Sequence, residues 1–106
     1  MKRLLFFLTV AMFVSCGRTF EQRTAKYAEV GSVNDNRAAV LDINEGVGRW
    51  GYVDGTGRLV IECRYADARS FDDGLAAVQE PEGLWGYIDT AGRAVVAPQF
   101  TVAGAF

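Results

Sequence analysis

The sequence contains no histidine, and this absence removes the commonest catalytic base and the commonest zinc ligand. Ser-His and Cys-His nucleophile pairs are excluded for the same reason. Carboxylates remain, but Asp72 and Asp73 are adjacent in a turn, where their side chains diverge, and Asp54 and Asp89 suit turn chemistry. Calcium needs about six to eight oxygen ligands, and no further acidic pattern follows these turns to supply them. We therefore expect no catalytic residue, no metal site and no cofactor, and we do not expect an enzyme.

The N-terminal hydrophobic run is too short to cross a membrane. It covers residues 4–14 (LLFFLTVAMFV), which is 11 residues, whereas a spanning helix needs about 20. Lys2 and Arg3 precede it and the small residue Ser15 follows it, which is the order of a secretory signal. We predict that residues 1–15 are a signal peptide and that the mature chain leaves the cytoplasm.

Only two cysteines are present, too few for a disulfide framework. Cys16 ends the stretch FVSC, which resembles the lipobox of bacterial lipoproteins, with Phe13 where an aliphatic residue is usual. The resemblance implies that Cys16 is lipidated, and its acyl chains would anchor the protein to a membrane. Cys63 is then a lone thiol; in the alternative, a soluble secreted form, Cys16 and Cys63 form a disulfide. We expect a lipid-anchored protein of the bacterial cell envelope, at the outer membrane or the periplasmic face.

Positive charge is scarce after the signal. Residues 16–106 contain 9 basic and 13 acidic side chains, a net charge of −4, and the arginines alternate with acids along the chain. A protein that binds nucleic acid presents a concentrated basic face. We therefore expect no nucleic-acid partner.

The main feature of the remaining chain is an internal repeat. WGYVDGTGRLVI (residues 50–61) returns as WGYIDTAGRAVV (residues 85–96), a shift of 35 residues. Upstream the shift is 38, because the first copy carries three extra residues between its Ala-Ala-Val and its tryptophan. The units are therefore residues 27–64 and 65–99, followed by the start of a third at 100–106. A fixed period in this range indicates a repeat architecture.

Each unit reads as three short β-strands. Each unit contains a hairpin. Its first strand begins at the tryptophan (Trp50 or Trp85), and its second strand follows the turn glycine (Gly57 or Gly92). In the turn, an Asp accepts a backbone N–H and the Gly takes a positive φ. A third strand follows the turns at residues 34–36 and 72–74. We predict an all-β fold with a signal peptide at 1–15, the lipidated Cys16 and a tether at 16–26, and the β domain at 27–106.

The Trp-Gly pairs raise two questions about packing. Glycine is poor in a strand unless another group must approach closely, so we expect a neighbouring aromatic ring or a backbone segment to pack on Gly51 and Gly86. The recurring aromatic residues either form the core or present a stacking surface for sugars, and their size favours the core. These residues are Trp50, Tyr52, Trp85 and Tyr87.

LWGYIDTAGRAVVAPQF (residues 84–100) and RWGYVDGTGRLVIECRYADARSFDDGLAAV (residues 49–78) resemble the WG repeat, also called the KWG repeat, of bacterial envelope proteins. The resemblance covers about residues 27–106. It implies a β-rich binding or scaffolding module without a general catalytic motif. We expect non-enzymatic interaction with an unknown protein partner, or self-association through an open β edge. The alternative is a cell-wall or polysaccharide-binding module that uses the repeat aromatics. The sequence names no ligand.

Overall fold

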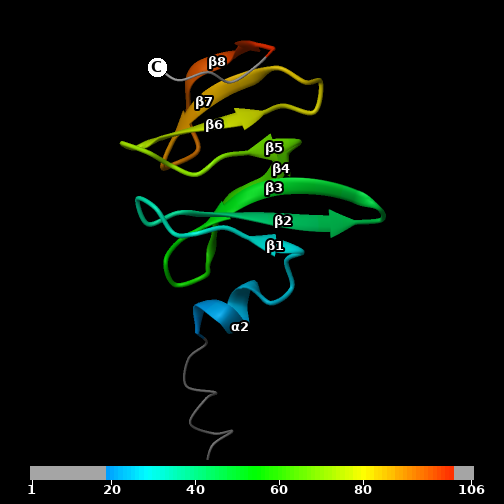
Figure 1. Cartoon of the computed structure of the whole chain (residues 1–106), viewed down its shortest axis with the longest axis vertical. Coiled ribbons are helices and arrows are strands. Elements are labelled where there is room, and N and C mark those ends of the chain that lie inside the picture. Colours follow the sequence, from blue (N-terminus) through cyan, green and yellow to red (C-terminus); the bar gives the residue numbers. More distant parts are fainter. Residues whose placement is uncertain (1–18, 102–106) are drawn as a thin grey trace, which may run out of the picture.

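The computed structural model describes residues 19–101, which form two antiparallel four-stranded sheets stacked one above the other (Figure 1). The first sheet has the order β1-β2-β3-β4, and its strands are β1 (Glu29–Val30), β2 (Ala38–Asn44), β3 (Val47–Val53) and β4 (Leu59–Tyr65). The second has the order β5-β6-β7-β8, and its strands are β5 (Asp67–Ala68), β6 (Leu75–Gln79), β7 (Trp85–Asp89) and β8 (Ala94–Phe100). The predicted all-β repeat fold is confirmed. Each unit contains the three predicted strands and one additional two-residue strand at its start.

The turns after the Trp-Gly strands have the predicted geometry. In the first unit the Gly57 amide donates to the Asp54 carbonyl at 2.9 Å, and Gly57 has a φ of +93°. Gly92 repeats this with the Asp89 carbonyl at 2.9 Å and a φ of +87°. An L side chain rarely adopts this conformation, so glycine is required at the closing position of both turns.

The three extra residues of the first unit lengthen one hairpin. Strands β2 and β3 pair along seven residues each and turn through Glu45 and Gly46, which have φ values of 53° and 81°. In the second unit, β6 and β7 pair along five residues each. The insertion therefore changes the length of a hairpin arm and leaves the rest of the unit in register.

A bulge in the neighbouring strand explains the Trp-Gly pair. Trp50 pairs with Tyr65 and Tyr52 pairs with Ile61, so three residues of β4 lie opposite the single residue Gly51. A Cβ built on Gly51 would lie 2.5 Å from the Ile61 carbonyl oxygen. Gly86 is placed in the same way, and a Cβ there would lie 2.7 Å from the Val96 carbonyl oxygen. The predicted close approach is made by backbone in both units, because the three atoms nearest to each Cβ position belong to the main chain.

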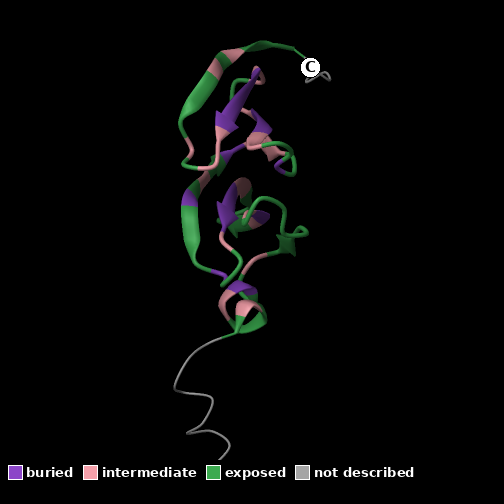
Figure 2. Ribbon diagram, turned by 90° about the vertical axis from the view of Figure 1, so that its left-hand side faces the viewer, coloured by how far each residue is buried: buried purple, intermediate pink, exposed green. Residues whose placement is uncertain are grey.

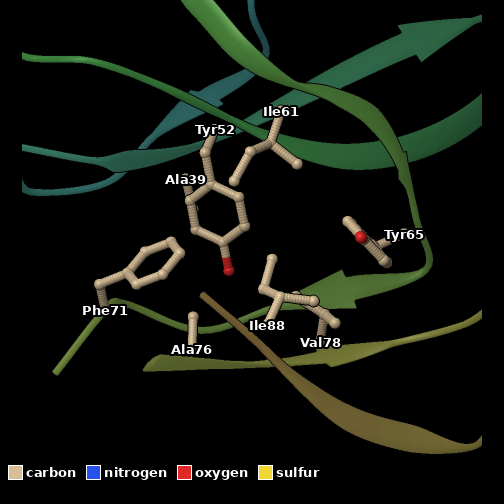
Figure 3. Close-up of a cluster of buried hydrophobic side chains, with 8 residues drawn as sticks. All are labelled: Ala39, Tyr52, Ile61, Tyr65, Phe71, Ala76, Val78 and Ile88. Carbon is tan, nitrogen blue, oxygen red and sulfur yellow. The ribbon is translucent and has the colours of Figure 1, made fainter. Parts of the chain in front are cut away.

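The two faces of each sheet serve different contacts. In the first sheet, Tyr52 and half-buried Trp50 face the second sheet, whereas Ala38, Val40 and Val53 form a separate cluster on the opposite face. The second sheet receives the first through Ala76, Val78 and Ile88. Figure 3 shows Tyr52 of the first sheet and Ala76, Val78 and Ile88 of the second sheet converging between the two sheets. The units therefore stack in one direction, with the Trp-Tyr face of one against the aliphatic face of the next.

A short helix, α2 (Phe20–Thr24), covers the free face of the first sheet (Figure 1). Thr19 caps it: its hydroxyl accepts from the Gln22 amide at 3.1 Å, and the Gln22 side chain accepts from the Thr19 amide at 3.0 Å. Phe20 packs on the cluster of Ala38, Val40 and Val53. Residues 16–26 were predicted as a tether, but from residue 19 onward this segment is folded and packed on the domain.

Candidate interaction surfaces

Three of the four repeat aromatics are buried, and the fourth, Trp50, is half-buried against the cluster between the sheets. Tyr52 is 0% exposed, Trp85 6% and Tyr87 8%. The Tyr52 ring meets Phe71 edge-on, with ring centroids 4.9 Å apart, and its hydroxyl donates to the Arg69 carbonyl at 2.6 Å. Burial, followed by the nearby Tyr65 and Asp67, raises the pKa of Tyr52 far above its usual value, so the hydroxyl remains a donor at neutral pH. This side chain joins the two units and offers no face to a sugar.

The second Trp-Tyr pair is covered in a similar way. The Arg69 guanidinium lies over the Trp85 ring, 5.0 Å from its centroid. Tyr87 meets Phe100 edge-on, with centroids 6.4 Å apart. A sugar-binding platform needs an aromatic face open to solvent. These rings therefore act as core, as their size favoured.

Asp54 and Asp89 stabilise their own turns. An oxygen of Asp54 accepts hydrogen bonds from the Thr56 hydroxyl at 2.6 Å, the Thr56 amide at 2.9 Å and the Arg58 amide at 3.1 Å. The Thr56 hydroxyl and then the Arg58 amide lower the pKa of Asp54 to about 2. The Arg93 amide is the main cause of the lowered pKa of Asp89. Both carboxylates are ionised at neutral pH, so neither is suited to accept and return a proton in catalysis.

Cys63 is a free, half-buried thiol in the part of the chain that the structure describes. It packs beside Tyr27 against the cluster under α2. Burial and then the Asp42 carboxylate raise the pKa of Cys63, so it is a thiol, and a poor nucleophile, at neutral pH. The predicted lipidation site, Cys16, and the predicted signal peptide lie outside the described residues. Among residues 19–101, no group of three or more Cys, Asp or Glu side chains is arranged to hold a metal ion.

Two long edge strands lie on the same side of the stack (Figure 2). β4 ends the first sheet and β8 ends the second, and no strand between residues 19 and 101 pairs with their outer sides. Exposed apolar side chains accompany these edges: Leu59 and Val60 on β4 are 48% and 42% exposed, and Val95 and Phe100 on β8 are 55% and 42% exposed. The opposite edges, β1 and β5, have two residues each. The alignment of β4 and β8 depends on stacking, so the repeat pattern alone did not predict it.

A second surface lies at the α2 end of the stack. Helix α2 and the turn before β4 line a groove of about 450 Å³ that contains Arg23, Lys26 and Arg58 and no acidic residue. We call it the basic groove. The Arg23 guanidinium donates to the carbonyl and hydroxyl oxygens of Thr56, at 3.3 and 3.4 Å, which joins the helix to the turn. Sequence reasoning missed this groove because it assigned Arg23 and Lys26 to a tether.

Comparison with protein families identifies the repeat. The family model of the WG containing repeat matches residues 50–83 and 85–106. The chain belongs to the WG containing repeat family. Each matched WG repeat starts at the tryptophan, inside a sheet, so the first runs from β3 through β4 into β5 and β6. One WG repeat therefore contributes two strands to one sheet and two to the next.

Other comparisons add no relative to this WG repeat protein. Neither a curated protein nor a solved structure matches the chain. Within residues 19–101, no helix has the length and apolarity needed to cross a membrane.

Proposed function

We propose that this WG repeat protein is a non-enzymatic, lipid-anchored protein of the bacterial cell envelope that binds a protein partner through β4 and β8. The observation that carries the proposal is the pair of seven-residue edge strands on one side of the stack. In this proposal Cys16 is the lipidated residue, and the edge strands β4 and β8 bind the partner.

An open edge strand presents a row of backbone donors and acceptors to any extended segment that lies beside it. Proteins that avoid such pairing shorten the edge, place charges or proline on it, or twist it with a bulge. β4 and β8 each contain a bulge, and Pro98 lies in β8, so the apolar ends of the two strands, and not their whole length, are open to pairing. β4 and β8 are long, and each has two exposed apolar residues, Leu59 and Val60 on β4 and Val95 and Phe100 on β8. β4 also carries the exposed residues Glu62 and Arg64, which can select among partner strands. These features support strand addition by another polypeptide chain.

The buried rings of Tyr52, Trp85 and Tyr87 favour a protein partner over a polysaccharide. A non-enzymatic role is supported by the use of Asp54 and Asp89 in turns and by the raised pKa of Cys63. A lipid anchor is supported by the FVSC stretch at residues 13–16.

Lysine substitutions on the two edges test the proposal. The native mass of complexes that contain this protein should be measured in mild-detergent extracts of its membranes. Val60→Lys together with Val95→Lys should reduce that mass to the monomer, because a charged edge opposes strand pairing. Ile43→Lys, on the β2–β3 arm, changes a side chain of similar exposure (56%) and should leave the complexes unchanged. An unchanged mass in the edge variant, or an equal loss in the Ile43 variant, would refute edge recognition.

The anchor is tested separately by the intact mass of the mature protein purified from membranes. A mass that begins at Cys16 and includes lipid, and that is lost with Cys16→Ser, is the expected result. A lipid-free mass would refute the lipid anchor and would indicate a soluble secreted protein.

A further inference from the structure

The basic groove gathers three cations that have no close carboxylate partner. Between residues 19 and 101, the two ion pairs within 4.0 Å join Arg64 to Glu80 and Arg93 to Asp89. Neither pair uses Arg23, Lys26 or Arg58. The Lys26 and Arg58 side chains are exposed at the rim of the groove. Arg23 donates to Thr56, and Lys26 lies over the Tyr27 ring, 5.4 Å from its centroid, but neither partner carries a negative charge. The three positive charges therefore remain available to an anionic ligand.

Charge is distributed unevenly along the stack. Residues 66–101, which form the second sheet, hold two arginines and six acids, a net charge of −4. Residues 19–65, which include the groove, hold six basic and seven acidic side chains, a net charge of −1. An anionic surface would therefore repel the second sheet and attract the basic groove.

The position of the groove along the chain points to one ligand. Only residues 17–19 separate Cys16 from the first residue of α2. From Cys16 to Phe20 there are four residue steps, which at about 3.5 Å each reach roughly 14 Å when fully extended. A lipid on Cys16 would therefore keep the α2 end of the stack within about two Debye lengths of the headgroups, where part of their charge still acts. Figure 1 places α2 at one end of the stack and β8 at the other.

We propose that the basic groove binds the headgroup phosphates of anionic phospholipids next to the anchor. Arg23, Lys26 and Arg58 contact the bilayer surface, and the domain stands with its second sheet away from the membrane. This orientation presents the β4 and β8 edges along the side of the stack, where a partner can reach them (Figure 2). The inference rests on the proposed lipid anchor and specifies how the anchored domain sits.

Hydrogen exchange of the membrane-extracted, lipidated protein tests this contact. The protein is reconstituted in vesicles of phosphatidylcholine alone and in equal parts of phosphatidylcholine and phosphatidylglycerol. The amides of residues 20–27 and 56–59 should exchange more slowly in the anionic vesicles, and about 1 M salt should abolish the difference by screening. The amides of β7 should exchange equally in both.

A matched pair of variants separates local contact from total charge. Lys26→Gln with Arg58→Gln should weaken the contact roughly 25-fold, because each cation near an anionic surface contributes about fivefold. The protection should then disappear. Arg69→Gln with Arg93→Gln removes the same charge from the second sheet, at the other end of the stack, and should retain the protection.

The outcomes distinguish this contact from the anchor. Flotation of the protein with both vesicle types, together with equal exchange in both, would overturn the headgroup contact and leave the anchor intact. Loss of the protection in both double variants would also overturn it, because total charge would then be the cause. Failure to float with either vesicle type would refute the anchor and the proposed orientation together.

Discussion

At the scale of single residues, a neighbouring strand explains why each Trp-Gly pair contains glycine. The bulges in β4 and β8 bring carbonyl oxygens to 2.5 and 2.7 Å from the positions where a Cβ would stand on Gly51 and Gly86. Backbone cannot move aside as a flexible side chain can. Both units therefore need glycine after the tryptophan for the same steric reason.

Alanine at either position should destabilise the fold. Gly51→Ala and Gly86→Ala should each lower the free energy of unfolding by about 3 kcal/mol, through overpacking against backbone. Urea unfolding measures this. Gly31→Ala is the control, because a Cβ there would lie 3.5 Å from the Ala39 carbonyl oxygen, an ordinary contact. If Gly31→Ala costs as much as Gly51→Ala, the bulge does not explain the glycine.

The turn carboxylates give the stability a dependence on acid pH. The pKa of Asp54 is about 2 in the folded chain and is about 3.9 in an unfolded chain. Its contribution to stability is therefore complete above about pH 4 and is lost as the pH falls toward about 2. Asp54→Asn retains an acceptor oxygen but no charge, so its urea midpoint should fall less steeply over this range. Parallel curves for wild type and variant would show that the carboxylate charge does not stabilise the turn.

Local signals predicted the turns, whereas contacts between distant residues decided the rest. Asp54 and Gly57 are three residues apart, so the sequence reveals their turn directly. The bulge opposite Gly51 depends on how β4 aligns with β3, which the sequence does not reveal. An aromatic ring and a backbone segment therefore both remained candidates for the group that packs on Gly51. The contact of Tyr52 with Phe71 and Arg69 joins two units, so the repeat indicated core aromatics but not their partners.

At the scale of secondary structure elements, α2 is the feature that sequence reasoning misassigned to a tether. A helix of five residues is marginal by itself, and the polar stretch around it is typical of a linker. The signal was present: Thr19 and Gln22 have the spacing of a capping box. Phe20 then supplies the apolar contact that holds the helix on the first sheet.

Removing the cap tests how far α2 contributes to the domain. Thr19→Ala should lower the free energy of unfolding by about 1 kcal/mol, because the Gln22 amide loses its acceptor. Thr19→Ser retains a hydroxyl at the same place and should keep most of the stability. Thermal or urea unfolding of the two variants compares them. Equal stability of Thr19→Ala and wild type would mean that the helix adds nothing to the fold, as a tether would.

At the scale of the whole molecule, the two sheets are joined by more than one kind of contact. The first matched WG repeat crosses from one sheet into the other. Side chains also link the units: Arg37 donates from Nε to the Thr90 carbonyl at 2.8 Å, and Asp35 accepts from the Gly74 amide at 2.9 Å. These contacts fix the position of β4 relative to β8. A partner that contacts both strands at once requires such a fixed arrangement.

The proposed function depends above all on the binding of partners along β4 and β8. Site-specific photo-crosslinking in native membranes tests it most directly, with a photoreactive residue in place of Val60, Val95, Ile43 or Val47 in turn. All four side chains are at least 42% exposed, so access alone does not separate them. Positions 60 and 95 should give adducts of the same mass, and positions 43 and 47 should give none. Adducts from the β2–β3 arm with none from the two edges would contradict it.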